Sequence, residues 1–170
     1  MKKLFVCILL FFIILGNVSQ AQDDNFKALF IYNVTNFIEW PAVEGNFVIY
    51  VLGNSPIIDI FKSDSKLKDK KVAGTPIAIE PLNDVKNAGS CQILYVPEDQ
   101  ADKMDAAVAA IGSKAILIVT HFDGAITKGS CINFYNKPDG KLTMQISRKN
   151  IESHGLKVGS QLLYLGDEVN

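Results

Sequence analysis

The chain has 170 residues, of which 48% are hydrophobic and 21% are charged, and its formal net charge at pH 7 is −1. This length fits one domain with a sizeable core. The near balance of charge excludes the basic surface that nucleic-acid binding requires. No low-complexity segment or long linker divides the sequence, so a second domain is not expected.

The N-terminus has the three parts of an export signal. Two lysines give it a positive start, residues 4–15 form an unbroken apolar run, and residues 19–21 (Ser-Gln-Ala) place small residues where a signal peptidase reads them. The apolar run covers about 12 residues, fewer than the roughly 20 that a membrane-spanning helix needs. We therefore expect residues 1–21 to be a cleaved signal peptide and residues 22–170 to be the exported domain.

Two cysteines remain in the exported part, Cys91 and Cys131, because Cys7 lies inside the apolar run. An even number in an exported chain favours one disulfide over two buried free thiols. Closing this loop of about 40 residues would stabilise the fold by roughly 4 kcal/mol. A zinc site is a weaker alternative, since His121 and His154 lack ligand-like spacing to the cysteines. We predict a Cys91–Cys131 disulfide and no metal site.

Residues 26–41 form the most amphipathic stretch of the exported part. The residues that recur there at helical spacing are Phe26, Leu29, Phe30, Asn33, Val34, Phe37 and Ile38. The Trp-Pro pair at the end disfavours helical geometry, so the helix is expected to end there. Most of this stripe should pack on a sheet. The flank left over, Ile31, Tyr32 and Thr35, is the candidate surface for a protein partner.

Strand and helix patterns alternate beyond this helix. Strands are expected over residues 46–52, 71–80, 91–96, 115–120, 131–135 and 142–146. Helices are expected after Ser55 and over residues 98–111, 150–154 and 160–165. Gly74 suggests a bulge in the second strand, and the Pro-Asp-Gly turn at 138–140 makes the last two strands antiparallel. The pattern predicts a three-layer α/β domain with a mostly parallel, partly antiparallel sheet of about six strands.

This arrangement constrains the predicted disulfide. In a simple strand order, the strands at 91–96 and 131–135 would flank the strand at 115–120, about 9 to 10 Å apart. A disulfide needs its Cα atoms within about 7 Å of each other. Either the strand order differs, or the two cysteines lie in converging loops before the strands. We favour the loops, because Cys91 and Cys131 each directly follow Gly-Ser.

The chain carries none of the common catalytic signatures, neither Gly-x-Ser-x-Gly nor His-Glu-x-x-His, nor a phosphate loop. The remaining candidates lie at the carboxyl ends of two expected strands, where open α/β sheets bind ligands. His121 and Asp123 could move a proton, and backbone N–H groups at Gly53 and Asn54 could bind an anion. In the plainer alternatives, Asp123 caps a helical turn, His121 is simply exposed, and Ser55 caps a helix.

The whole exported part resembles the YfiR family of periplasmic regulators. The order and spacing of several segments carry this resemblance, rather than any one of them. These segments are 28–33 (Ala-Leu-Phe-Ile-Tyr-Asn), 37–41 (Phe-Ile-Glu-Trp-Pro), 51–53 (Val-Leu-Gly), 91–95 (Cys-Gln-Ile-Leu-Tyr), 116–120 (Ile-Leu-Ile-Val-Thr), 132–134 (Ile-Asn-Phe), 145–151 (Gln-Ile-Ser-Arg-Lys-Asn-Ile), 155–158 (Gly-Leu-Lys-Val) and 161–163 (Gln-Leu-Leu).

The resemblance implies a periplasmic protein that is not an enzyme, needs no cofactor and represses a membrane diguanylate cyclase, and so acts in cyclic di-GMP signalling. It implies the periplasmic part of that inner-membrane protein as partner, with an outer-membrane lipoprotein as a second partner that sequesters the domain. A sensor kinase in place of the cyclase, and a homodimer, stay open. The pairing of Cys91 with Cys131 is similar to a family disulfide, and a second cysteine pair of some members is missing here.

One rival interpretation belongs to another class of protein. A periplasmic module acting with a membrane sensor kinase would bind a small molecule at the sheet edge near Gly53 and His121. An enzyme that uses His121 for proton transfer ranks third.

Overall fold

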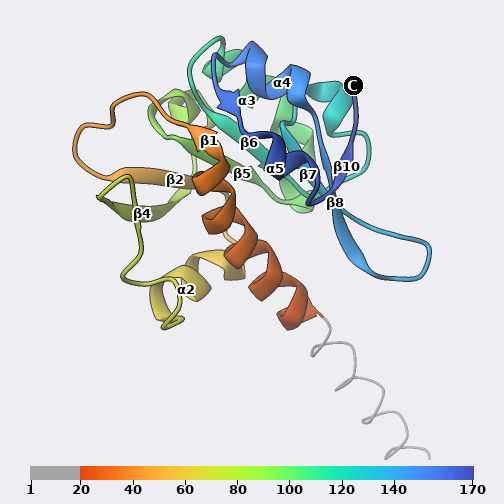
Figure 1. The fold of residues 1–170 in the computed structure, drawn as a ribbon, viewed down its shortest axis with the longest axis horizontal. Helices are drawn as coiled ribbons and strands as arrows, with labels where there is room; N and C mark the ends of the chain where they lie inside the picture. The colour runs from red at the N-terminus through yellow and green to blue at the C-terminus, as the bar shows by residue number, and fades with distance from the viewer. Residues whose placement is uncertain (1–19) are drawn as a thin grey trace, which may run out of the picture.

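The computed structural model describes residues 20–170 (Figure 1). Residues 1–19, which hold Cys7 and most of the expected signal peptide, lie outside this part. Within the described part, no helix is both long enough and apolar enough to cross a membrane.

Helices and strands alternate along the described chain, as the sequence predicts. The α-helices are the N-terminal helix (20–34), α2 Pro56–Ser63, α3 Met104–Ile111, α4 Arg148–Ser153 and α5 Ser160–Leu163. The 3-10 helices are η1 Thr35–Phe37, η2 Val85–Ser90, η3 Glu98–Lys103 and η4 Ile126–Lys128. The strands are β1 Ile38–Glu39, β2 Phe47–Leu52, β3 Lys71–Val72, β4 Thr75–Leu82, β5 Ile93–Val96, β6 Leu117–Thr120, β7 Ile132–Asn136, β8 Leu142–Ile146, β9 Lys157–Val158 and β10 Asp167–Glu168.

The main sheet has eight strands in the order β10-β8-β7-β6-β5-β2-β4-β3. Neighbours from β4 to β7 run parallel, while β8 is antiparallel to β7 and β3 is antiparallel to β4. The α/β class and the mostly parallel, partly antiparallel sheet are therefore confirmed. The strands that the sequence missed, β1, β9 and β10, have two residues each, too short to produce a period-two pattern.

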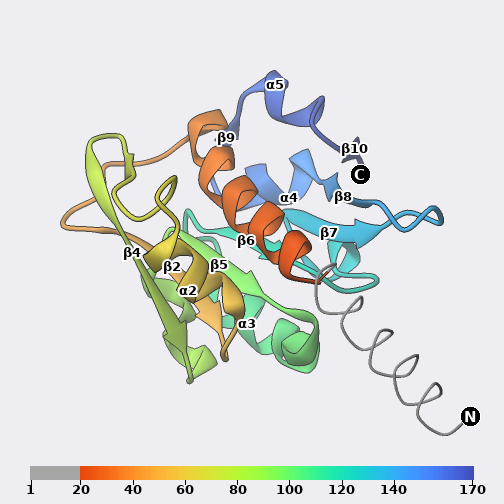
Figure 2. The same cartoon turned by 90° about the horizontal axis from the view of Figure 1, so that it is seen from below.

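Helices cover both faces of the sheet. The N-terminal helix and α2 lie on one face, and η2 and α3 pack together on the other (Figure 2). Every residue of β5 and β6 is buried, because these central strands have a layer on each side. The chain goes from β2 to β4 on one side of the sheet and from β5 to β6 on the other, so the strand order reverses between β2 and β5. Right-handed crossovers in opposite directions place helices on opposite faces of the sheet.

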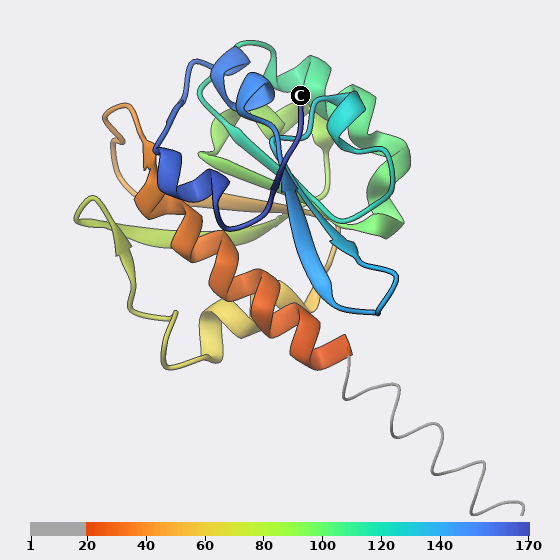
Figure 3. The same ribbon diagram turned by 45° about the vertical axis from the view of Figure 1, so that its right-hand side comes forward.

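The N-terminal helix ends earlier than the sequence predicts. It stops at residue 34, η1 follows, and β1 then pairs with β9 through Ile38 and Val158. Figure 3 shows α5 beside this end of the helix. The Trp-Pro signal instead marks the end of β1, where the Trp40 indole donates a hydrogen bond of 3.0 Å to the Thr35 carbonyl and packs edge-on against Phe47.

The segment expected as one strand over residues 71–80 is a hairpin. β3 and β4 are joined by Ala73 and Gly74, which have positive φ angles of 50° and 84°. Two successive positive φ angles are typical of the type I′ turn that joins tight hairpins, so Gly74 serves a turn rather than a bulge.

The predicted disulfide is wrong, since Cys91 and Cys131 are free and buried. Strand β6 lies between β5 and β7, as the simple strand order requires. The two cysteines also lie at different levels, because the Leu117 amide bonds to the Gln92 carbonyl while the Cys131 amide bonds to the Ile118 carbonyl. The alternative of two buried thiols is therefore the observed one.

Candidate functional site

A polar cavity of about 320 Å³ lies at the carboxyl edge of the parallel strands. The loops that follow β2, β5 and β6 line it, and the first two turns of the N-terminal helix close one side. This is the position where the strand order reverses between β2 and β5. Doubly wound sheets bind ligands at such a reversal, because the two loops diverge there and leave a crevice.

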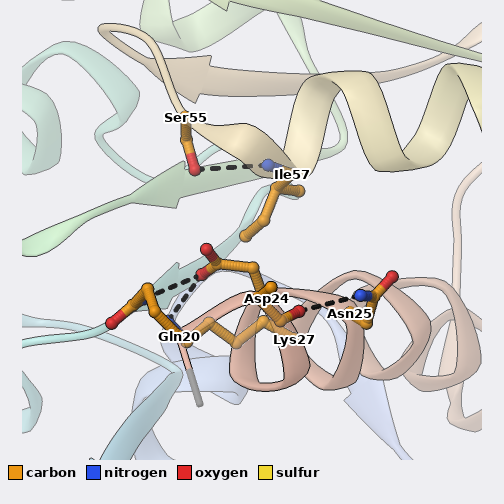
Figure 4. Close-up of polar contacts among 7 residues, drawn as sticks. Gln20, Asp24, Asn25, Lys27, Ser55 and Ile57 are labelled. Atoms are coloured by element: carbon orange, nitrogen blue, oxygen red, sulfur yellow. Dashed lines mark hydrogen bonds and ion pairs between the residues drawn. The ribbon is translucent and has the colours of Figure 1, made fainter. Parts of the chain in front are cut away.

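The inner wall of the cavity carries a buried ion pair within the N-terminal helix. Lys27 Nζ lies 3.0 Å from Asp24 Oδ1, and the two side chains are 2% and 9% exposed. Figure 4 shows the Asp24 side chain pointing away from its helix, towards the loop that begins α2. Gln20 Nε2 donates a longer hydrogen bond of 3.3 Å to the same carboxylate. Gln20 belongs to the expected signal peptide, so this contact would be lost on cleavage, whereas the Lys27–Asp24 pair would remain.

Sequence reasoning missed this pair because it took charged residues for the solvent face. The buried stripe of the helix is shifted from the expected one and consists of Asp24, Lys27, Ala28, Phe30, Ile31 and Val34, and Thr35 continues it at the start of η1. Phe26, expected in the core, is 41% exposed. The Asp-x-x-Lys spacing was the available signal, since residues three apart share a helix face.

Tyr95 and His121 form the part of the cavity that belongs to the sheet. Tyr95 is 2% exposed, and no described residue hydrogen-bonds to its hydroxyl, which opens on the cavity. Burial, reinforced by the negative charge of Asp24, raises the pKa of Tyr95. Burial first, and then the positive charge of Lys27, lower the pKa of His121 below 6.5, so its imidazole is neutral at pH 7.

The turn from β2 to α2 is an N-cap and offers little to an anion. Ser55 Oγ accepts a hydrogen bond from the Ile57 amide at 3.4 Å, and the Ser55 carbonyl accepts one from the Ile58 amide at 3.1 Å. Pro56 has no N–H group. The first N–H groups of α2 are therefore occupied or missing, and the plainer reading of Ser55 as a cap is confirmed.

Of the four predicted edge residues, the structure brings Asn54 and His121 together in the cavity. Gly53 instead makes the preceding turn, where its φ is 73° and a Cβ atom would lie 3.0 Å from the Gln100 side chain. Asp123 lies in a neighbouring hollow of about 270 Å³ that shares His121 and Glu98 with the cavity.

His121 and Asp123 do not form a proton-transfer pair in this structure. No hydrogen bond joins the two side chains, and the backbone after His121 is held instead by Asn133, whose Oδ1 accepts from the Phe122 amide at 3.2 Å. Asp123 caps no helical turn either, because η4 begins after Ala125 without a side-chain cap. His121 is half-buried, so the reading of a simply exposed histidine does not hold.

The expectation that Ile31, Tyr32 and Thr35 form an exposed flank is wrong for two of the three. Ile31 is fully buried and Thr35 is 3% exposed, with its hydroxyl donating to the Tyr32 carbonyl at 2.7 Å. Tyr32 is half-buried, with Lys70 Nζ 5.6 Å from its ring centre. The flank faces inwards because the helix buries its Lys27 face rather than its Phe26 face.

Between residues 20 and 170, no group of three or more histidine, cysteine, aspartate or glutamate residues could hold a metal ion. The cavity combines neutral donors, one ion pair and two further carboxylates, Glu98 and Asp99, on its rim. Such a set can bind and orient a small polar molecule, but it contains no nucleophile paired with a base.

Fold and site together define a doubly wound α/β domain with a ligand-sized cavity at its switch point. The model of the YfiR/HmsC-like family matches residues 24–167, and the chain belongs to that family. The YfiR/HmsC-like family is one of regulatory proteins in cyclic di-GMP signalling.

The fold is also similar to the crystal structure of a conserved domain protein from Vibrio cholerae O1 biovar El Tor strain N16961, with a TM-score of 0.60 at 12% identity. The match covers 86% of this chain and 60% of that one, so this chain spans less than two thirds of that protein. At this identity the likeness shows the fold alone. None of the curated proteins matches the chain.

Proposed function

We propose that this chain is a periplasmic regulator that binds the periplasmic part of an inner-membrane diguanylate cyclase and represses it. The observation that carries the proposal is the family match over residues 24–167. Repression of this kind needs no reaction, only tighter binding to the inactive conformation of the cyclase than to the active one. An outer-membrane lipoprotein that sequesters the domain would then relieve repression, and a sensor kinase is the alternative membrane partner.

The exposed apolar side chains are candidates for the contact with the partner. In the described part, the large ones are Phe26, Tyr164 and Leu165, at 41%, 87% and 47% exposure. Tyr164 and Leu165 follow α5 directly and lie side by side in sequence. Aromatic residues of this kind carry much of the binding free energy in protein interfaces.

The experiment is capture from membranes. The exported chain, carrying a photo-crosslinking group at position 164, is expected to cross-link to a diguanylate cyclase, and deletion of the chain is expected to raise cellular cyclic di-GMP. Tyr164→Ala with Leu165→Ala should weaken both effects, whereas Lys157→Ala on exposed β9 should leave them unchanged. Unchanged cyclic di-GMP in the deletion strain, with no signalling protein captured, would rule the proposal out.

A second function is favoured by the cavity itself. A small-molecule sensor would use the hollow lined by Asn54, Tyr95 and His121 and would pass the bound state on to a membrane protein. A ligand that binds only the folded domain stabilises it as the ligand concentration rises. Thermal unfolding with and without test compounds therefore checks this function directly.

A further inference from the structure

We propose that the cavity between Lys27 and Glu98 binds a small organic cation, a protonated amine that also carries a hydroxyl group. The inference rests on the ligand-binding function proposed for this cavity and is independent of which membrane protein is the partner.

The inner wall of the cavity has hydrogen-bonding capacity that the described residues do not fill. An ammonium group has three N–H donors, and that of Lys27 makes one hydrogen bond within the described chain, to Asp24. The hydroxyl of Tyr95, which also lines the cavity, makes none with the described residues. Both side chains are 2% exposed. The Tyr95 hydroxyl is nevertheless not sealed off, because it keeps accessible surface on the cavity that it lines, and a ligand group can reach it there. The two groups therefore point to a ligand oxygen that accepts from Lys27 and bonds to Tyr95.

The rim selects the charge of the ligand. Lys27 and Asp24 neutralise each other, and His121 is neutral, which leaves the carboxylates of Glu98 and Asp99 as the uncompensated charges of the lining. A cation at the rim would gain charge-assisted hydrogen bonds to these carboxylates. A ligand carboxylate or phosphate would meet three carboxylates, Asp24 included, and find no free N–H groups at the start of α2.

The two requirements fix the ligand class. The end that enters the cavity is a neutral oxygen, and the end at the rim is a cation. A volume of about 320 Å³ is small for a ligand site, since such sites usually span roughly 300 to 1,000 Å³. An amino alcohol of a few heavy atoms meets all three conditions. An amino acid does not, because its carboxylate would replace the neutral oxygen next to Asp24.

The test uses the protein purified after export, with thermal unfolding and calorimetric titration. Ethanolamine is the test compound, N-acetylethanolamine is its neutral control, and glycine and phosphate are the anionic comparisons. We expect ethanolamine to raise the melting temperature with concentration, and the comparison compounds to have little effect. Added salt should weaken binding, because the rim carboxylates are exposed.

Substitutions locate the binding in the cavity. Glu98→Gln with Asp99→Asn should weaken ethanolamine binding about tenfold, as expected for a lost hydrogen bond between charged groups. Tyr95→Phe should weaken it several-fold without unfolding the chain, since the hydroxyl has no partner to lose within the described part. Glu80→Gln removes an exposed carboxylate of β4, away from the cavity, and should change nothing.

Several outcomes would overturn the inference. Equal stabilisation by N-acetylethanolamine would remove the role of the positive charge, and unchanged affinity in the Glu98→Gln, Asp99→Asn variant would move the site elsewhere. If glycine or phosphate binds instead and Tyr95→Phe weakens it, the ligand class is wrong while the cavity keeps its binding function. If no compound stabilises the protein, the inference fails, while the sensor function is decided separately by thermal unfolding with other classes of compound.

Discussion

The ammonium group of Lys27 and the carboxylate of Asp24 are 3.0 Å apart and almost completely removed from solvent. Both lie on the buried face of the N-terminal helix, beside residues of the hydrophobic core. Burying two charges costs several kcal/mol for each ion, and their attraction offsets this cost only while both are present. The intact pair therefore contributes little net stability, but loss of either charge is expected to destabilise the fold strongly.

Removing one member of this pair is expected to be far worse than removing both. Asp24→Asn should lower the free energy of unfolding by about 3 kcal/mol, because it leaves a buried ammonium without a counter-charge. Asp24→Leu combined with Lys27→Met should recover most of that loss. Urea unfolding of the single and double variants measures both values.

The exposed pair of Lys157 and Glu39 is the matched control. Its side chains are 81% and 75% exposed, so Lys157→Met should change the free energy of unfolding by less than about 0.5 kcal/mol. If Asp24→Asn lowers the free energy of unfolding no more than Lys157→Met does, the Lys27–Asp24 pair is solvated and does not form a buried wall of the cavity.

The thiols of Cys91 and Cys131 should be inert in the native protein. Burial raises the pKa of each thiol to about 12, so the reactive thiolate is scarce at pH 8. After export and without reductant, iodoacetamide should label neither cysteine until urea unfolds the chain, and then both. The melting temperature should be the same with and without dithiothreitol. A mass two units lower, with a melting temperature that reductant decreases, would instead demonstrate a disulfide.

His121 should make the stability depend on pH. Its pKa is lowered in the folded state, first by burial and then by Lys27, so the unfolded chain binds the proton more readily. The contribution of neutral His121 is fully present above the unfolded value of about 6.5 and is lost as the pH falls below it. The free energy of unfolding should therefore decrease from pH 7 to pH 5, and His121→Gln should flatten this decrease.

His154 should contribute to the same pH dependence of stability, so its share has to be measured separately. Burial lowers its pKa as well, so His154→Gln should remove its own share of the same slope. The double variant should be the flattest of the four proteins between pH 7 and pH 5. A slope that is identical in wild type and His121→Gln would show that the imidazole is solvated rather than half-buried.

The sequence predicts the fold well where apolar runs and turn signals are clear. It does not predict the site, because the site depends on how the N-terminal helix packs. The apolar runs of β5 and β6 and the turn at Pro138 identify the parallel core and the antiparallel strand from sequence alone. The rotation of the N-terminal helix is different, because both of its faces carry apolar residues. Whether Lys27 or Phe26 turns inwards is decided by the cavity edge and by Phe134 of β7, on which Phe26 and Phe30 rest.

The cysteines illustrate the same limit. Their number and their shared Gly-Ser-Cys context favoured a disulfide, while the strand order argued against one. The strand register prevents the disulfide, because β6 lies between the two cysteines and they lie at different levels along it. Sequence composition carries no register information. The disulfide was therefore wrong, and so was the expectation that the loops before β5 and β7 converge to form it.

Asn133 should be the residue that holds the His121 side of the cavity in place. Its Oδ1 accepts hydrogen bonds from Thr120 Oγ1 at 2.7 Å and from the Phe122 amide at 3.2 Å, on either side of His121, and its side chain is 1% exposed. Asn133→Leu leaves both donors buried without this acceptor, and should lower the free energy of unfolding by about 2 kcal/mol. Asn136→Leu, at the exposed end of the same strand, is the control and should have little effect.

Hydrogen exchange gives the sharper measurement, because the Phe122 amide should exchange much faster in Asn133→Leu than amides of β5 do. Equal protection of Phe122 in both variants would mean that β6 alone positions His121, without help from the Asn133 side chain.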